Sequence, residues 1–240
     1  EAWKETKFTE GAFNPTIGVL SSLWNIGQDN AGFPGEEAIK AATKLVDIEA
    51  LEIKNHSVFL KKKGMSIDLG GIAKEFALFQ SACLAEEKYH EGMLIDAGGD
   101  IATVGNKSDG SPWCIGIQHP RKRNTLLATI MLDNWDMIQT SGDYRRFIKH
   151  KDTFYSHIFH TVKDEIPLIS ATLIFKRNKI IAPFGGAACL ASGLNKVKQW
   201  LVKVPEIEAV LITYDGRAFI TKGVQNYIHF LDDTIELQML

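Results

Sequence analysis

Short runs of alternating or β-branched apolar residues recur through the chain, separated by residue pairs that favour tight turns. Six runs predict strands, near 57–61, 93–96, 113–118, 126–132, 170–175 and 209–214. The turn signals are Asp109-Gly110, Gly142-Asp143 and Asp215-Gly216. Because short connections of this kind join hairpin neighbours, we expect antiparallel sheets rather than a doubly wound parallel sheet.

Apolar residues at three- and four-residue spacing predict four helices, near 15–25, 35–46, 71–87 and 187–202. The first residues, EAWKETKFTEGAF, have the pattern of the second half of a helix, so we expect a further segment upstream of Glu1. We find no internal repeat, low-complexity tract or linker. The pattern therefore predicts one α+β domain over residues 1–240, with antiparallel sheets flanked by helices.

Composition narrows the classes of partner. Apolar residues make up 45 % of the 240, enough for a substantial core, and the net charge is -2. That charge balance gives no electrostatic basis for binding nucleic acid or an anionic membrane. The one dense basic run, Arg121 to Arg123, follows a proline in a polar stretch and is expected to be a solvated loop. No apolar run reaches the about 18 to 20 residues that a membrane span needs.

The stretch SIDLGGIAKEF, residues 66–76, places Asp68, two glycines and Lys74 between an expected strand and an expected helix. Glycines at such a junction let a ligand or another backbone come close, and a helix N-terminus presents free N–H groups that favour anions. A nucleotide is one candidate ligand. A tight turn followed by a solvated lysine explains the same residues equally well.

Small and polar residues also gather in four other stretches, where element ends and therefore sites are expected. These are GAFNPTIG (11–18), IDAGGDIATVG (95–105), QTSGDYRRF (139–147) and YSHIFH (155–160). Each has a simpler reading. Asn14 can be a helix N-cap, Asp96 and Asp100 can close a hairpin with Asx turns, and His157 and His160 can be ordinary exposed or core histidines rather than metal ligands.

Taken in order, the stretches GAFNPTIGVLSSLW, IDLGGIAKEFA, LIDAGGDIATVG, PWCIGIQHPR and TSGDYRRF resemble the ApbE family, the FAD:protein FMN transferases. The resemblance covers most of residues 10–160 and implies a mixed α+β fold. It further implies a transferase that binds FAD, cleaves its pyrophosphate with a divalent metal, and attaches FMN through a phosphoester to Thr or Ser of a target protein.

The resemblance also assigns roles residue by residue. The implied flavin-nucleotide contacts are Ala12, Phe13, Asn14, Asp68, Lys74 and His157. Asn14 stands where the family usually has Asp. Gly71 is expected to offer its backbone oxygen to the metal, and His157 to lie near the reacting phosphate as the catalytic residue. A lysine beside phosphates offsets their charge, which suits Lys74.

Two departures from the family pattern fall in the second half of the chain. His157 is retained, but the Asp-Pro and Thr-Gly that follow it in the family are replaced. The family's metal-binding Asp and Thr correspond to Pro183 and Ala187, with Gly186 between them. No side-chain oxygen remains at these positions and no replacement is found nearby in the sequence, so Mg²⁺ binding is left open.

Two functions follow from the retained and lost positions. The first is an FAD:protein FMN transferase whose partner is a target protein with an acceptor Thr or Ser, for example a membrane redox subunit. The alternative is a non-catalytic descendant that binds FAD or a protein. By resemblance to the family, we expect an extracytoplasmic or periplasmic location, including lipid anchoring through an upstream segment.

Overall fold

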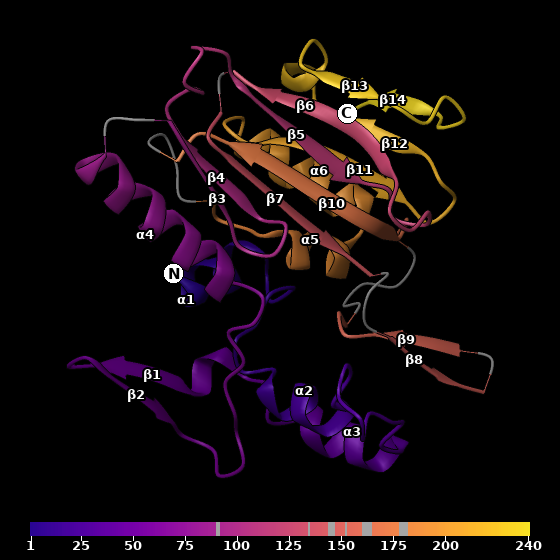
Figure 1. Ribbon diagram of the computed structural model, residues 1–240. Helices are drawn as coiled ribbons and strands as arrows, with labels where there is room; N and C mark the ends of the chain where they lie inside the picture. Colours follow the sequence, from indigo (N-terminus) through magenta and orange to yellow (C-terminus); the bar gives the residue numbers. More distant parts are fainter. Residues whose placement is uncertain (90–91, 134, 144–146, 152, 160–164, 178–181) are drawn as a thin grey trace.

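The structure is a computed structural model that describes residues 1–240 except 90–91, 134, 144–146, 152, 160–164 and 178–181 (Figure 1). Its α-helices are α1 Ala2–Phe8, α2 Gly18–Trp24, α3 Glu36–Thr43, α4 Ala73–Lys88, α5 Gly186–Ser192 and α6 Leu194–Lys203. Its strands are β1 Leu51–Lys54, β2 Ser57–Leu60, β3 Met93–Asp96, β4 Ile101–Val104, β5 Trp113–Gln118, β6 Leu126–Leu132, β7 Met137–Gly142, β8 Phe147–His150, β9 Thr153–Ser156, β10 Leu168–Phe175, β11 Glu208–Thr213, β12 Ala218–Ile220, β13 Ile228–Phe230 and β14 Leu237–Met239.

A seven-stranded sheet in the order β14-β12-β11-β10-β7-β4-β3 forms the centre of the molecule. All its neighbouring strands run antiparallel except β12 and β14, which are parallel. Every residue of β10, LISATLIF, is buried, as expected for a strand covered on both faces. The α+β class with antiparallel sheets is thus confirmed, with one parallel pair at the sheet edge.

The two faces of the central sheet are covered by different elements (Figure 1). Helices α4, α5 and α6 pack on one face, where Phe175, Phe184 and Trp200 belong to the larger apolar core. A three-stranded sheet, β13-β6-β5, supplies the second core, in which Ile130 and Ile174 are fully buried. Burial on both faces fixes the strand register, because a one-residue slip would turn the apolar side chains to the wrong face.

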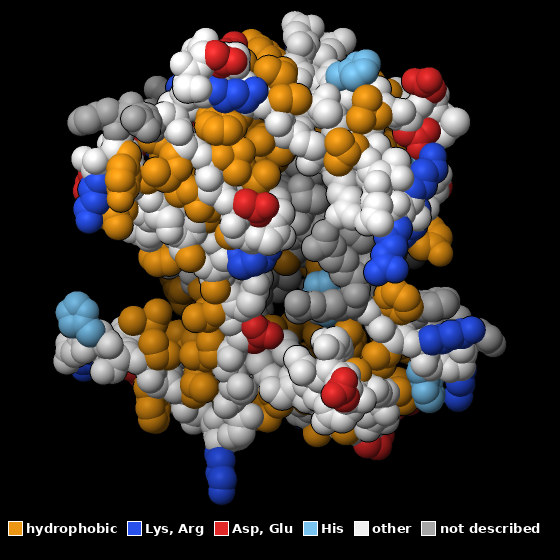
Figure 2. All heavy atoms as spheres, in the orientation of Figure 1, with side chains coloured by type: hydrophobic (Ala, Val, Ile, Leu, Met, Phe, Trp, Pro, Cys, Tyr) orange, Lys and Arg blue, Asp and Glu red, His pale blue; other side chains and the backbone are white. Residues whose placement is uncertain are grey.

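Three small units lie beside the central sheet: the hairpin β1–β2, the pair α2–α3 and the hairpin β8–β9 (Figure 1). Hairpin β1–β2 exposes Ile53, Val58 and Phe59. Figure 2 shows that the molecule is hollowed between these lower units and the sheet above. Within the described ranges, no helix is long and apolar enough to span a membrane.

Three local predictions need correction. The helix expected near 187–202 is two helices, because Gly193 has φ +80° and ends α5 before α6 begins. The helix expected from residue 15 begins at Gly18. Gly142 does not start a turn, since it is the last residue of β7 and pairs with Ser170 of β10.

Candidate functional site

A cavity of about 870 Å³ collects nearly all the residues that the sequence singled out. Its walls include Ala12, Phe13, Asn14, Asp68, Gly71, Lys74, His157, Gly186 and Ala187. These residues come from four separate segments of the chain, and the fold brings them to one place. Pro183 is the exception: it lines a second, smaller cavity of about 310 Å³.

The turn before α4 explains the composition of the SIDLGGIAKEF stretch. Asp68 Oδ1 accepts a hydrogen bond of 2.7 Å from the Gly70 N–H, and the Asp68 N–H donates to the Pro15 carbonyl at 2.8 Å. Gly71 lies against the Phe13 ring, where an added Cβ would be 3.0 Å from the nearest ring carbon. The first glycine therefore serves the turn, and the second serves close packing at the cavity wall.

Asn14 does not cap a helix, so the helix-cap reading of Asn14 is wrong. Its Oδ1 accepts hydrogen bonds from the Thr16 N–H at 3.0 Å and the Thr16 hydroxyl at 2.7 Å, which closes a local turn. The N-cap of α2 is Ile17. Asn14 thereby stays on the cavity wall while α2 begins further along the chain.

Lys74 and Asp100 form an ion pair at the cavity wall. Lys74 Nζ lies 2.6 Å from Asp100 Oδ2, and the other carboxylate oxygen of Asp100 accepts a hydrogen bond of 3.1 Å from the Thr140 N–H. Asp100 is only 7 % exposed, whereas the lysine side chain remains largely accessible. Lys74 is thus held by an acid rather than solvated freely, and the pair joins α4 to the β3–β4 turn.

The β3–β4 hairpin confirms the turn expected around Gly98-Gly99. Asp96 Oδ1 accepts a hydrogen bond of 2.7 Å from the Gly99 N–H, and both glycines have positive φ, +73° and +98°. Such values strain residues with a side chain. The same two glycines line the large cavity, so the turn also presents bare backbone to it.

His157 follows β9 and lines the same cavity as Asp68 and Lys74. The structure thus brings the expected catalytic histidine to the expected nucleotide side chains. Its neighbour in the motif, His160, lies outside the described residues. Tyr144 and the two arginines at 145–146 in the TSGDYRRF stretch lie outside them too.

The start of α5 closes one side of the cavity. An added Cβ at Gly186 would lie 2.7 Å from Ser141 Cβ and Oγ, so α5 packs directly on β7 at this glycine. Ala187 approaches the turn before α4, with its Cβ 3.7 Å from the position of a Cβ on Gly71. The residues at the family's metal-ligand positions are therefore packed closely, and none of them offers a side-chain oxygen.

Two carboxyl groups, Glu5 of α1 and Glu75 of α4, gather beside that helix start. Burial raises the pKa of Glu5 to about 7, although the carboxylate accepts a hydrogen bond of 2.7 Å from the Gly185 N–H. Burial raises the pKa of Glu75 to about 8, and the charge of Glu5 raises it further. The amide of Gln139 faces Glu75 and partly offsets that rise. Acids with raised pKa values cluster at functional sites.

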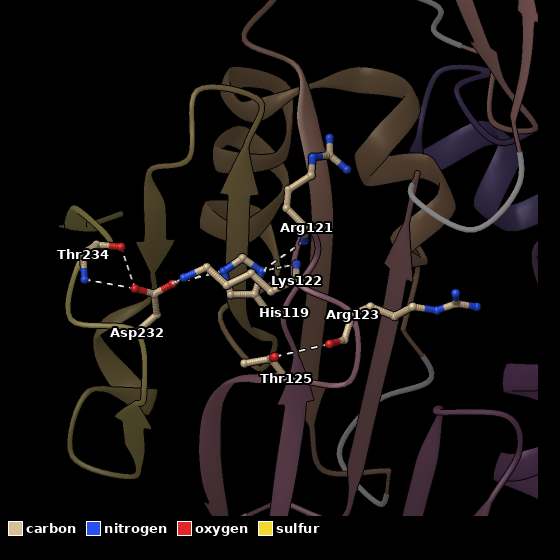
Figure 3. A network of polar contacts seen from close by, with 7 residues as sticks. All are labelled: His119, Arg121, Lys122, Arg123, Thr125, Asp232 and Thr234. Atoms are coloured by element: carbon tan, nitrogen blue, oxygen red, sulfur yellow. Dashed lines mark hydrogen bonds and ion pairs between the residues drawn. The ribbon is translucent and has the colours of Figure 1, made fainter.

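The basic run 121–123 lies in the β5–β6 connection and is exposed, as expected (Figure 3). Lys122 Nζ lies 2.5 Å from Asp232, and this bond is the largest cause that holds the pKa of that acid well below its ordinary value. The Arg121 guanidinium makes two hydrogen bonds to Asp143, at 2.8 and 3.2 Å. Arg121 and Lys122 are thus paired with acids of the same chain.

Comparisons with known proteins bear on this cavity. A family profile described as the ApbE family matches residues 1–211. The chain belongs to the ApbE family. An FAD:protein FMN transferase from Treponema pallidum is 29 % identical over 95 % of the chain and 68 % of its own length. One from Escherichia coli K12 is 27 % identical over 93 % of the chain and 66 % of its own. One from Vibrio cholerae is 31 % identical over 66 % of the chain and 48 % of its own.

Solved structures agree with the assignment of the ApbE family. The crystal structure of the ApbE protein from Thermotoga maritima aligns with a TM-score of 0.81 at 27 % identity, covering 94 % of the chain and 75 % of its own. The apo form of the flavinyl transferase ApbE from Pseudomonas stutzeri aligns with a TM-score of 0.75 at 24 % identity, over 94 % of the chain and 72 % of its own, and supports the fold. The chain spans about half to two thirds of the lengths of the curated relatives named above.

Some cavity residues could not be singled out from the sequence. Gln139 opens one of the polar stretches but carried no expected role, and Glu5 and Glu75 look like ordinary charged positions on helices. One signal was available for Glu75, since it directly follows Lys74 in a stretch already marked as a site. Nothing local marks Glu5, because it meets α4 only through the fold.

Proposed function

We propose that the chain is an FAD:protein FMN transferase that attaches FMN to a Thr or Ser hydroxyl of a target protein. The observation that carries the proposal is the convergence of the expected flavin-nucleotide residues on one cavity, in a chain of the ApbE family. The cavity volume of about 870 Å³ falls within the about 300 to 1,000 Å³ usual for small-molecule sites. Curated relatives named FAD:protein FMN transferase support the same activity.

The reaction balances without an oxidant or reductant. The acceptor hydroxyl oxygen forms a bond to the FMN-side phosphorus of FAD. The bond from that phosphorus to the bridging oxygen breaks, and AMP leaves with the bonding electrons. The hydroxyl proton passes to a base, a role for which the His157 imidazole is suited by its place on the cavity wall.

The other residues bind and orient the nucleotide. Asp68 can accept hydrogen bonds from ribose hydroxyls or an adenine amine with the oxygen atoms that the turn leaves accessible. Lys74, fixed by Asp100, places positive charge at the wall where phosphates would lie. A divalent cation, when bound, offsets the charge of the phosphates during transfer.

Incubation of the protein with FAD, Mg²⁺ and a Thr-containing acceptor peptide, followed by mass spectrometry, tests the proposal. We expect a peptide mass increase equal to FMN minus water, with release of AMP. His157→Ala is expected to slow transfer by about 10²- to 10⁴-fold, the usual contribution of a general base, while FAD still binds. Absence of any mass increase, in the presence of bound FAD, would contradict the transferase and favour a non-catalytic flavin-binding protein.

We propose, as a finer assignment, that the acceptor is a redox subunit at a membrane and that the protein works outside the cytoplasm, including as a lipid-anchored form. The support is resemblance to the family alone. Fractionation of cells that express the native gene, with antibody detection, tests the location. Recovery in the cytoplasmic fraction alone would contradict it.

A further inference from the structure

The loss of the family's metal ligands coincides in space with the two buried glutamates. Pro183, which stands at the place of the family's Asp, lines the smaller cavity of about 310 Å³ together with Glu5 and Glu75. Glu75 also lines the larger cavity. Two carboxylates from other segments of the chain therefore flank the position where a carboxylate has disappeared.

Three oxygen atoms converge on one point beside Gly185. A Cβ on this glycine would lie 3.4 Å from Glu5 Oε1, 3.4 Å from Glu75 Oε2 and 3.8 Å from the Gly71 carbonyl oxygen. Gly71 is the residue whose backbone oxygen the resemblance assigns to the metal. Carboxylate and carbonyl oxygens are the ligands that Mg²⁺ and Mn²⁺ prefer.

A separate observation at the same corner points to a further polar species. Gln139 is only 5 % exposed, lies against Glu75 and lines the larger cavity, yet its Nε2 completes no hydrogen bond with any residue that the structure describes. Buried polar side chains almost always find a partner in the protein, in water or in a ligand. Nε2 is a donor, so what it lacks is an acceptor in good geometry, such as the oxygen of a water molecule bound to a cation beside Glu75.

Two lysines near these glutamates are engaged with other acids. Lys4, which lines the smaller cavity, pairs with Glu1 at 3.0 Å, and Lys74 pairs with Asp100 at 2.6 Å. Among the ion pairs of the described residues, none includes Glu5 or Glu75. Two adjacent buried carboxylates without a cation are costly, since each charge disfavours the other.

We propose that Glu5 and Glu75, with the carbonyl oxygen of Gly71, bind a divalent cation of the Mg²⁺ or Mn²⁺ class in place of the family's Asp and Thr. The metal site then takes its side-chain ligands from α1 and α4 instead of from the start of α5. Its use in catalysis rests on the transferase function proposed above. Binding of the cation by the protein does not.

The test is Mn²⁺ binding to the purified chain, measured by electron paramagnetic resonance of free Mn²⁺, with and without FAD. We expect saturable binding that Mg²⁺ displaces. Glu5→Gln and Glu75→Gln are each expected to lower the Mn²⁺ affinity by about tenfold or more. Loss of a residue that only supports a metal ligand already costs about that much. Glu87→Gln, on the exposed face of the same helix α4, is the matched control and should bind Mn²⁺ like the unaltered chain.

A variant that should regain Mn²⁺ binding distinguishes the loss of a ligand from misfolding of the protein. Pro183→Asp returns a carboxylate to the family's position, so it should restore Mn²⁺ binding to Glu75→Gln. Circular dichroism verifies that each variant is folded. Unchanged Mn²⁺ affinity in folded Glu5→Gln and Glu75→Gln, or no Mn²⁺ binding by the unaltered chain in either condition, would overturn the relocated site.

The two proposals fail in different ways. If FMN transfer proceeds but Mn²⁺ binding ignores both glutamates, the relocated site is wrong and the transferase stands. If Mn²⁺ binds through the glutamates but no FMN reaches the acceptor peptide, the site stands and the transferase is wrong.

Discussion

Buried acids on two sides of the site are stabilised in opposite ways. On the side of the larger cavity, the Asp100 carboxylate pairs with Lys74 at 2.6 Å and accepts a hydrogen bond from the Thr140 N–H at 3.1 Å. On the side of the smaller cavity, Glu5 and Glu75 lie together, and burial raises the pKa of both. The first arrangement is complete as folded, whereas the second is costly until a cation or protons are added. The difference indicates which side serves to position a ligand and which side serves to recruit an ion.

Replacement of Lys74 has the largest expected effect. It would leave Asp100 as a buried acid without a cation, as Glu5 and Glu75 are. In Lys74→Met, Asp100 keeps its backbone donor but loses its cation, and the phosphates of FAD lose a positive neighbour. A hydrogen bond to a charged group is worth about 1.5 to 3 kcal/mol, so FAD affinity should fall roughly 10- to 100-fold. Fluorescence titration with FAD measures this. Lys88→Met, at the far end of α4, is the control, and equal affinities in the two variants would contradict the role of Lys74.

Gly186→Ala tests how tightly the start of α5 is packed against β7. The new Cβ would lie 2.7 Å from Ser141 Cβ. Because that atom is bonded directly to the backbone of β7, either α5 or β7 must shift. Overpacking of this kind costs about 1 to 3 kcal/mol of unfolding free energy. Urea unfolding, followed by circular dichroism, measures the loss. A variant as stable as the unaltered chain would show that α5 can move at little cost.

Glu5→Gln should stabilise the metal-free protein at alkaline pH. Because the folded pKa is about 7, above the ordinary 4.5, the folded state loses stability as the pH rises through this interval and the carboxyl ionises. The amide retains an acceptor for the Gly185 N–H. We expect a gain of about 1 to 2 kcal/mol at pH 8.5 in EDTA and almost none at pH 4.5. Urea unfolding at both pH values checks the sign, and a loss of stability at pH 8.5 would contradict the comparison.

Gly185→Ala separates ion binding from packing with the smallest effect on stability. The three heavy atoms nearest to its Cβ would be the Glu5, Glu75 and Gly71 oxygens, at ordinary contact distances of 3.4 to 3.8 Å, and the backbone there is extended. Unfolding free energy should fall by less than about 1 kcal/mol, the cost of alanine at a helix N-cap. Mn²⁺ affinity should nevertheless fall, because the methyl group occupies the convergence point. Unaltered Mn²⁺ binding would place the ion elsewhere.

Much of the fold could be predicted from the sequence because its signals are local. Strands β3, β5 and β6 match the expected runs, since alternation and β-branching act within a few residues. The expected runs did not include β1, β4, β7, β8, β9, β12, β13 and β14. Some of these strands pair with partners far along the chain, as β7 does with β10 and β13 with β6, so no local pattern marks the pairing.

The site was predictable in proportion to how much of it lies in continuous motifs. Asp68, Gly71 and Lys74 share one turn and could be found together, and the family assignment made from those motifs is confirmed. Glu5 and Gly185 meet only after folding, 180 residues apart in sequence, so no local pattern connects them. The assigned roles of the cavity residues, and the extent of the domain, remain predictions.

Trp24 gives this cavity a built-in optical reporter. The indole is 4 % exposed, packs on Tyr155 at a centroid distance of 4.8 Å, and forms part of the cavity wall. An isoalloxazine ring that enters the cavity absorbs where tryptophan emits, so excitation energy would pass from the indole to the flavin. The chain has five tryptophans, so occupancy would appear as a partial loss of ultraviolet emission, and comparison with Trp24→Phe would assign that loss to this indole.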